Sequence, residues 1–393
     1  MKWTTAISRA TTLEAAVSEI AEELKKNHVG AMDLAVVFVS AHHASQYRLL
    51  PAMLHKSLTI RELVGCSGGG IIGGDREVES GPALSVTVAH LPEVGLKSFA
   101  LDAEAVEALA ARPKSWRELL ELEPEHEINF ILLPNPFACP AQRLLDGLDA
   151  AFPDSPKVGA MASGGKDRET TALFLRQGME DAAVIGLVLW GDIQMETAVS
   201  QGCRPIGVPF ILTHCHKNLA IQLDGEPAIK ALDKVYGNLS KADRERFRSS
   251  PHVGIGLHAG KHPFRQGDYL LRNVLGVDRE KGAVALGARL KIGMELRFHI
   301  RDADTSAVDL DVVLDAAVNR VKEPQGALLF SCLGRGEGLY GAPGHDSGVF
   351  KKYFKDVSLG GFFGNGEIGP VQGKTYLHGY TSAFAFFRSK GWS

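Results

Sequence analysis

The sequence has no apolar run long enough to cross a membrane. A membrane-spanning helix needs roughly 18 or more consecutive apolar residues, and charged, polar or glycine residues interrupt every apolar stretch of this 393-residue chain before that length. The first residues, Met1–Ala6, lack the apolar segment of a signal peptide. We therefore expect a cytoplasmic protein that does not insert into a membrane.

Cysteine is scarce, and its spacing excludes the usual disulfide and zinc motifs. There are five cysteines, an odd number, and none forms a paired CxxC motif. They lie in or beside apolar runs, at Cys66, Cys139, Cys203, Cys215 and Cys332. Free thiols in a reducing cytoplasm are the simplest interpretation.

The chain also has little net charge. Its 43 Lys and Arg residues nearly balance 46 Asp and Glu residues, for a net charge of −3, and no basic run stands out. This balance argues against a nucleic-acid partner. The length and the 45% hydrophobic content are enough for a large core divided among two or three domains.

Three stretches of the chain share one layout. Each begins with a short apolar run typical of a buried strand, passes through a helical segment and reaches a glycine-rich run. The apolar runs begin at Asp33, Ile128 and Ala327, and the glycine-rich runs begin at Gly65, Gly159 and Gly360. Because the three separations are nearly equal, we predict three strand–helix–strand–strand repeats. A hairpin after each glycine-rich run makes the sheets mixed, so the expected fold class is α/β with mixed sheets.

The pattern changes between the second and third repeats. Residues 199–322 contain several short strands with polar turns and one or two helices, which predicts a β-rich inserted domain. The predicted division is therefore residues 1–198, with two repeats, and residues 199–393. The second part comprises the insert, at about 199–322, and the third repeat, 323–393.

Two amphipathic helices frame these regions. Thr11–His28 carries a capping-box pattern at Thr11 and Glu14, and apolar residues recur along it at helical spacing. Asp302–Lys322 has an apolar face that includes Leu310, Leu314 and Ala317. We expect the first helix to pack on the first sheet and the second to return the chain to the third repeat.

Several motifs together resemble those of the FIST family, named for F-box and intracellular signal transduction proteins. They are the run Gly360–Pro370 (GGFFGNGEIGP) with Tyr376–His378, the segment Phe330–Gly336 (FSCLGRG) and the segment Val64–Gly69 (VGCSGG). The similarity covers an N-terminal and a C-terminal FIST region, which together span nearly the whole chain. The resemblance implies a sensory protein of signal transduction with small ligands such as amino acids. It fixes no chemistry, since a fold alone does not specify function.

The third repeat carries the best candidates for ligand binding. Arg335, in a glycine-rich strand exit, can bind a carboxylate through two parallel hydrogen bonds, and Glu367 can receive an ammonium group. Asn365 can both donate and accept hydrogen bonds. An Arg and a Glu that converge would suit an amino-acid zwitterion. The structural alternative is an Arg335–Glu367 salt bridge that braces the third repeat.

Further candidates lie at or beside the same motifs. The expected ligand-binding set adds His378, Cys332, Cys66 and Ser67, because a glycine-rich backbone can approach a ligand closely. A signalling partner protein is also expected, since the chain carries no recognisable output segment of its own. No catalytic residue is assigned, and an enzyme is the less favoured interpretation.

Three alternatives remain open. His214-Cys215-His216 resembles a soft metal-ligand cluster, but a strand would place only the two histidines on one face, and partners such as His252, His258 or His262 would be needed. No cofactor is expected, although haem is possible, because some FIST-like proteins are described as haem-based nitric oxide sensors. A hydrolase or transferase could use Cys332, Cys66 or Ser163 as its nucleophile. The run Ser163–Lys166 could otherwise form a turn or an anion cradle.

Overall fold

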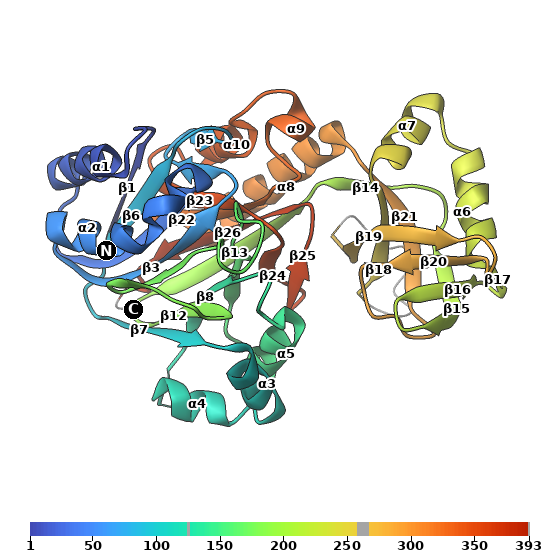
Figure 1. Cartoon of the computed structure of the whole chain (residues 1–393), viewed down its shortest axis with the longest axis horizontal. Coiled ribbons are helices and arrows are strands. Elements are labelled where there is room, and N and C mark those ends of the chain that lie inside the picture. The colour runs from blue at the N-terminus through green and yellow to red at the C-terminus, as the bar shows by residue number, and fades with distance from the viewer. Residues whose placement is uncertain (124–125, 258–266, 392–393) are drawn as a thin grey trace. The chain divides into compact units, whose positions relative to one another are not determined.

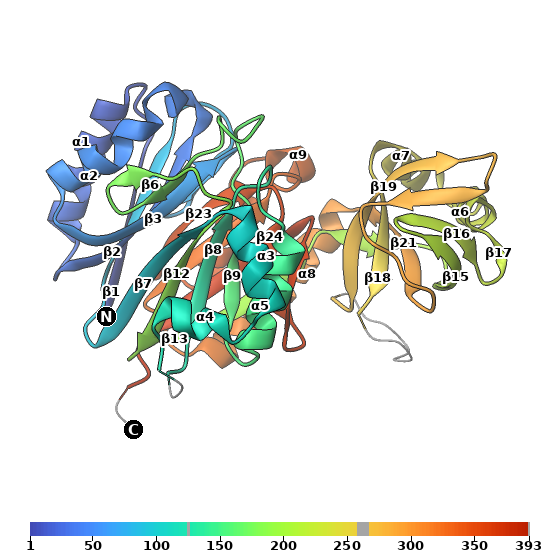
Figure 2. The ribbon, with the colours of Figure 1, turned by 60° about the horizontal axis from the view of Figure 1, so that its bottom comes forward.

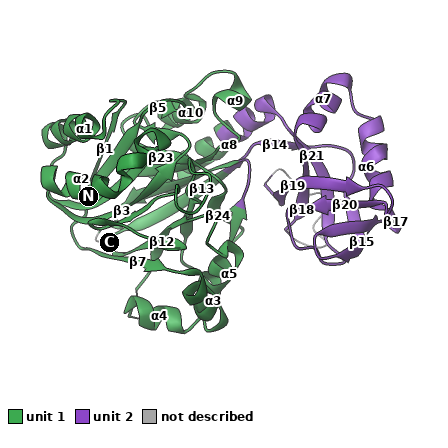
Figure 3. Ribbon diagram, viewed as in Figure 1, with its two compact units in different colours: residues 1–199, 311–377, 381–393 green, residues 200–310, 378–380 purple. Residues whose placement is uncertain are grey.

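The computed structural model describes residues 1–123, 126–257 and 267–391. The chain forms two compact units (Figure 3). Residues 1–199, 311–377 and 381–393 make up the first unit, and residues 200–310 and 378–380 make up the second. The second unit is therefore inserted, in sequence, between parts of the first.

Three six-stranded sheets form the first unit (Figure 1). The first sheet contains, in spatial order, β1 (Lys2–Ser8), β6 (Leu84–His90), β2 (Met32–Ser40), β3 (Ile60–Gly68), β10 (Leu173–Leu175) and β11 (Gly178–Met179). The second contains β25 (Lys374–His378), β24 (Glu367–Val371), β9 (Lys157–Ala160), β8 (Asn129–Pro134), β12 (Val184–Gly191) and β7 (Val94–Leu101). The third contains β13 (Gln194–Gln201), β26 (Thr381–Arg388), β22 (Gly326–Cys332), β23 (Ser358–Gly364), β4 (Ile71–Gly73) and β5 (Arg76–Val78).

Each sheet is built around one parallel pair of strands. The pairs are β2 with β3, β8 with β9, and β22 with β23. An antiparallel strand, respectively β6, β12 or β26, lies on the other side of the first member of each pair. Parallel strands need a crossover connection, and helical segments provide it here. The mixed α/β fold class predicted from the sequence is confirmed.

The hairpin that follows each parallel pair joins a different sheet from the pair itself. Strand β4 pairs with β23, β10 pairs with β3, and β24 pairs with β9. The three sheets are thereby interlocked, because the two strands at one edge of each sheet come from the hairpin that follows the parallel pair of another sheet. The connections follow the same order in the three sheets, while repetition of one sequence unit remains a prediction.

A common core lies between the three sheets. Phe38, Phe330 and Phe362 come from different strands and pack together there. The ring of Phe38 stacks on Phe362 at 4.7 Å and meets Phe330 edge-on at 6.3 Å. Such contacts add roughly 0.5–1.5 kcal/mol each to the burial of the rings.

Helices cover the outer faces of the sheets (Figure 2). The first sheet is covered by α1 (Leu13–Asn27), the 3₁₀ helix η1 (Ala41–Leu49) and α2 (Leu50–Ser57). The second is covered by α3 (Ala103–Ala111), α4 (Ser115–Leu120) and α5 (Ala141–Ala151). Helix α8 (Ala303–Val321) begins in the second unit and continues in the first from Asp311, and α9 (Glu337–Tyr340) and α10 (His345–Tyr353) also belong to the first unit. Of these, α10 packs Phe350 on Phe384 of β26, with ring centroids 6.0 Å apart.

One glycine of each glycine-rich run, Gly65, Gly159 or Gly361, lies within a strand rather than in a loop. A side chain at Gly361 would place its Cβ 1.9 Å from the carbonyl oxygen of Leu329 on the parallel neighbour. Gly65 and Gly159 occupy the corresponding places in the other two sheets, at 2.1 and 1.9 Å from a neighbouring carbonyl oxygen. These glycines are required by the close approach of two strands, which differs from the expected close approach to a ligand.

The second unit is a closed barrel of six strands. The ring runs through β21 (Glu295–Arg301), β15 (Phe210–His216), β16 (Leu219–Leu223), β20 (Ala283–Leu286), β19 (Tyr269–Asp278) and β18 (Pro251–Gly256), which pairs again with β21. The short strands β14 (Cys203–Pro205) and β17 (Glu226–Pro227) and the helices α6 (Ala228–Gly237) and α7 (Lys241–Ser249) complete it. Alternate residues of the strands, such as Leu296 and Phe298, fill its interior.

Candidate functional site

Arg335 pairs with Asp346 and not with Glu367. Its Nε donates to one carboxylate oxygen of Asp346 at 2.8 Å and its Nη2 donates to the other at 3.0 Å. Both side chains are almost completely buried, with 0% and 1% exposed. The predicted Arg335–Glu367 salt bridge is therefore wrong, because a carboxylate from the first turn of α10 already occupies the forked edge of the guanidinium.

Asp346 is held by more than the arginine. Its carboxylate also accepts hydrogen bonds from the hydroxyls of Ser331 and Ser382, at 3.1 and 2.5 Å, and from Nδ1 of His345 at 3.1 Å. Burial alone would raise the pKa of Asp346, but Arg335 and these donors outweigh burial and hold the pKa well below its usual range. Asp346 is thus a fixed anion that orients Arg335.

One nitrogen of Arg335 is left without a partner. Its Nη1 is buried and has no hydrogen-bond partner among the described residues. The guanidinium lies 5.6 Å from the ring of Tyr340, and Cys332 is near enough to influence it electrostatically. A buried donor without a partner costs about 1–3 kcal/mol. Nη1 therefore keeps an unused capacity to donate a hydrogen bond.

Glu367 is a fully buried carboxyl group at the start of β24. One of its oxygens accepts from the hydroxyl and the backbone nitrogen of Thr381, at 2.8 and 3.2 Å, and the other accepts from the Gly366 nitrogen at 3.3 Å. Burial raises the pKa of Glu367 to about 8, although these hydrogen bonds and the charge of Arg335 oppose the shift. At neutral pH the group is mostly protonated.

The remaining predicted ligand-binding residues do not all lie near Arg335 and Glu367. Asn365 is exposed, and its backbone nitrogen donates to the carbonyl of Met161. His378 is buried and belongs to the segment 378–380 of the second unit, whereas Arg335 and Glu367 belong to the first. Cys332 ends β22, and its sulfur accepts from the Gly334 nitrogen at 3.4 Å. Cys332 is thus the predicted partner that lies beside Arg335.

Ser67 and Cys66 belong to β3 and are completely buried. The Ser67 hydroxyl donates to the carbonyl of Ser163 at 2.8 Å and accepts from the Ala172 nitrogen at 3.1 Å. Burial raises the pKa of the Cys66 thiol well above its ordinary value. The Ser67 hydroxyl is engaged in holding strands together, and the raised thiol pKa of Cys66 is the opposite of what a nucleophile needs.

Ser163 connects the ends of strands from different sheets. Its hydroxyl accepts from the Gly69 nitrogen at 2.8 Å and donates to the carbonyl of Phe363 at 2.5 Å. Its backbone nitrogen donates to the carbonyl of Ser67. The hydroxyl hydrogen is used in this connection, so the residue acts as a bridge between the carboxyl ends of the parallel strands.

The comparison with family models now gives the identity of the fold. The chain matches the FIST N domain over residues 33–226 and the FIST C domain over residues 228–370. It belongs to the FIST family. FIST domains are sensory domains of signal transduction, so the interlocked sheets and the barrel described above form a sensory fold.

The FIST chain has relatives in bacteria and in eukaryotes. An uncharacterised protein of Mycobacterium tuberculosis is 32% identical over 385 residues, which cover 97% of this chain and 98% of the relative. F-box only protein 22 of Homo sapiens is 33% identical over 108 residues, or 25% of this chain and 27% of that protein. Among solved structures, a cyanuric acid hydrolase from A. caulinodans aligns over 99% of both chains at 8% identity with a TM-score of 0.37. That likeness is too low to support an argument.

Sequence reasoning missed two carboxyl groups near the Arg335–Asp346 pair of this FIST protein. Glu77 of β5 accepts from the Ser347 nitrogen at 2.6 Å, and its other oxygen is buried without a hydrogen-bond partner among the described residues. Burial and the charge of Asp346 raise the pKa of Glu77 to about 7. Glu79 accepts from the Glu337 nitrogen at 2.8 Å. Both residues belong to a stretch whose pattern indicates a polar hairpin, and only the exchange of hairpins between sheets brings it here.

The metal candidates do not assemble in the described part of the chain. His214 and His216 are exposed on β15. No group of three or more His, Cys, Asp or Glu residues that could hold a metal ion occurs among the described residues. His258 and His262 lie outside the described residues. No helix in residues 1–123, 126–257 and 267–391 is long and apolar enough to span a bilayer.

Proposed function

We propose that this FIST protein senses a small molecule that binds beside Arg335 and Glu367. The observation that carries the proposal is the buried Nη1 of Arg335, a cationic donor without a partner among the described residues, on a guanidinium whose other edge is satisfied. Binding sites typically fix ligands with a few well-placed polar groups. A zwitterion such as an amino acid remains the proposed ligand class.

The Arg335–Asp346 pair means that a ligand carboxylate would be held differently from the two parallel hydrogen bonds expected from the sequence. Because Asp346 occupies Nε and Nη2, a ligand carboxylate would accept from Nη1 alone. An ammonium group on the ligand would approach Glu367, which must lose its proton to become an anion. Proton release at neutral pH therefore accompanies the binding of a zwitterion, since the pKa of Glu367 is about 8.

The proposal is tested by thermal unfolding with a panel of amino acids, related amines and carboxylates. A ligand present at about a hundred times its dissociation constant stabilises the folded state by roughly 2.7 kcal/mol. We expect one class of zwitterions to raise the melting temperature of the wild-type protein. The shift should be lost in Glu367→Gln, which preserves the size of the side chain and its capacity to accept from Thr381.

A matched control is Glu295→Gln in the second unit. Glu295 is also a buried carboxyl group that accepts a hydroxyl hydrogen bond, from Tyr269 at 3.2 Å. This variant should keep the ligand-induced shift. An equal loss in the two variants, or no shift with any zwitterion, would exclude the Arg335–Glu367 site.

The haem-sensor alternative has no axial residue assigned from the sequence, and the two histidines named as metal candidates suit that role poorly. A haem ligand needs one imidazole in an apolar pocket, whereas His214 and His216 are exposed on a barrel strand. A Soret band that develops on titration with haemin, and that persists in the His214→Ala and His216→Ala variants, would support haem binding through another residue.

The hydrolase or transferase alternative now depends on Cys332 alone. Ser163 uses its hydroxyl to connect strands, and Cys66 is fully buried with a raised pKa. Cys332 lies near Arg335, and its sulfur accepts a hydrogen bond from the Gly334 nitrogen. Turnover that is lost in Cys332→Ala while ligand binding is retained would favour this alternative.

A further inference from the structure

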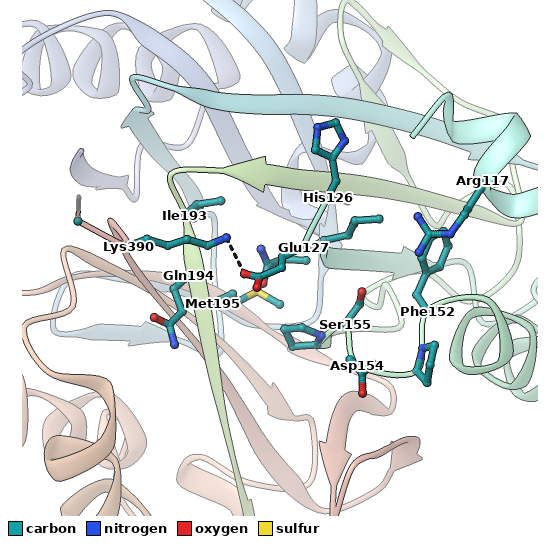
Figure 4. A pocket seen from close by; sticks show the side chains of 15 residues that line it. Arg117, His126, Glu127, Phe152, Asp154, Ser155, Ile193, Gln194, Met195 and Lys390 are labelled. Carbon is teal, nitrogen blue, oxygen red and sulfur yellow. Dashed lines mark hydrogen bonds and ion pairs between the residues drawn. The ribbon is translucent and has the colours of Figure 1, made fainter. Parts of the chain in front are cut away.

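A second candidate site lies in the first unit, at the amino ends of β8 and β9 (Figure 4). It is a cavity of about 750 Å³, within the range of roughly 300–1,000 Å³ that ligand pockets occupy. Its walls come from α4, the loop between α5 and β9, the start of β13 and the C-terminal segment at Lys390. None of the residues expected from the sequence to bind a ligand lines it.

Arg117 is the principal cation of this cavity. It extends from α4 toward the cavity, and its guanidinium lies 4.8 Å from the centre of the Phe152 ring (Figure 4). Nη1 donates to the Glu123 carbonyl at 3.3 Å, while Nε and Nη2 have no hydrogen-bond partner among the described residues. These two nitrogens form the edge that binds carboxylate or phosphate through parallel hydrogen bonds. The aromatic ring holds the plane of the guanidinium and leaves that edge free.

A buried lysine fixes the loop that forms one wall. Lys157 is completely buried, and its ammonium group donates to the carbonyls of Phe152 and Ser155 at 2.7 and 2.8 Å and pairs with Asp149 at 3.0 Å. Burial lowers the pKa of Lys157, although Asp149 opposes the shift. Three partners for one ammonium group lock residues 152–155 in place. The wall on which Arg117 lies is therefore already ordered without a ligand.

Lys390, the other lysine or arginine of the lining, is already paired, so Arg117 is the cation that can bind a ligand. Lys390 pairs with Glu127 at 2.7 Å across the cavity from Arg117 (Figure 4), and its backbone nitrogen is anchored on Asp192. Asp154 is exposed, so solvent screens its negative charge. A ligand with a single oxyanionic group would therefore meet an unused cation at one end of the cavity and a neutralised pair at the other.

We infer that this cavity is a binding site for a small oxyanion, a carboxylate or a phosphate monoester, held by the Nε and Nη2 edge of Arg117. The hydroxyl of Ser155, which also lines the cavity, supplies a further donor. This site is separate from the Arg335–Glu367 site and does not depend on the function proposed there.

The test is a calorimetric titration of the full chain with inorganic phosphate and with lactate, at constant ionic strength. We expect saturable binding of at least one probe with one site per chain. Loss of two charge-assisted hydrogen bonds should weaken binding at least about tenfold in Arg117→Ala. Arg117→Gln, which can still donate to the Glu123 carbonyl, should weaken binding to a similar extent and guards against a loss of folding.

Two further variants make the result specific. Arg112→Ala removes an exposed arginine just after α3 that does not line the cavity, so binding should change less than twofold. Asp154→Asn removes the negative charge of the rim and should strengthen binding. The inference is overturned if neither probe saturates the wild-type protein, if Arg112→Ala weakens binding as much as Arg117→Ala, or if Asp154→Asn weakens it.

Discussion

Arg335 donates through Nε and Nη2 to both carboxylate oxygens of Asp346, at 2.8 and 3.0 Å, in a site from which solvent is almost completely excluded. This pair joins the exit of β22 to the first turn of α10. It leaves Nη1 of Arg335 as a buried donor without a partner among the described residues. The pair therefore connects two elements of the fold and also holds in place the Nη1 group that we propose binds a ligand.

The Arg335–Asp346 pair should be costly to break. Replacing Asp346 by Asn leaves the buried guanidinium without its counter-charge, and removing one partner of such a pair typically costs about 3–5 kcal/mol. We expect a loss of this size in the free energy of unfolding, measured by urea denaturation. The double variant Arg335→Met/Asp346→Leu should recover part of it. A loss of less than about 1 kcal/mol in Asp346→Asn would contradict a tightly coupled pair.

Glu367 should make stability depend on pH. Its pKa is raised from 4.5 to about 8 on folding, so the folded state holds a proton that the unfolded state releases above about pH 4.5. The stabilising contribution is complete below that pH and is lost as the pH rises through 8, at up to about 1.4 kcal/mol per pH unit.

Comparison with Glu367→Gln isolates this effect. The amide does not titrate, so the difference in stability between wild type and variant should change steadily from pH 5 to pH 8, with the wild type losing stability relative to the variant. Denaturation curves at several pH values measure the difference. A constant difference over that range would mean that Glu367 is already ionised at pH 5.

Gly361 should tolerate no side chain. A Cβ there would lie 1.9 Å from the Leu329 carbonyl oxygen, so Gly361→Ala requires two paired strands to move apart. We expect a destabilisation of several kcal/mol or a failure to fold, as for the most severely overpacked sites. A Cβ at Gly348 in α10 would meet no atom within 4 Å, and Gly348→Ala should instead stabilise by about 0.5–1 kcal/mol. Thermal unfolding compares the two variants, and a similar loss in both would contradict the close approach at Gly361.

Lys157→Met should loosen the loop before β9. The substitution removes the donors to the Phe152 and Ser155 carbonyls, while Asp149 keeps its hydrogen bonds from Thr375 at 2.7 and 2.8 Å. We expect faster amide hydrogen exchange across residues 152–156 and weaker oxyanion binding in the cavity. Unchanged exchange in this loop would show that other contacts fix it.

Much of the fold could be predicted from local sequence patterns. The strand Asp33–Ser40 and the helix Asp302–Lys322 occur as β2 and α8 within one residue at each end, because continuous apolar runs and helical spacing are strong local signals. The first helix is also present, although Thr12 rather than Thr11 caps it through the Ala15 nitrogen. A difference of one residue at a cap is beyond what a pattern specifies.

The exchange of hairpins between sheets could not be predicted in the same way. Glu77 reaches Ser347 because β5 follows β4 onto the edge of the third sheet, far from its own stretch of chain. No local pattern encodes that pairing. The same limit explains why the sequence suggests that Arg335 and Glu367 converge and gives no sign of Asp346, since an Asp in the first turn of a helix is usually explained by a favourable interaction with the helix dipole.

The proposal that a zwitterion binds beside Arg335 and Glu367 is tested most directly by the proton released on binding. Calorimetric titration at pH 7 in buffers of different ionisation enthalpy gives this number for whichever amino acid raises the melting temperature. With a pKa of about 8, Glu367 is protonated in about nine of ten molecules. The proposal predicts release of nearly one proton per ligand in the wild type and no heat of binding in Glu367→Gln. Binding that releases no proton from the wild type would contradict it.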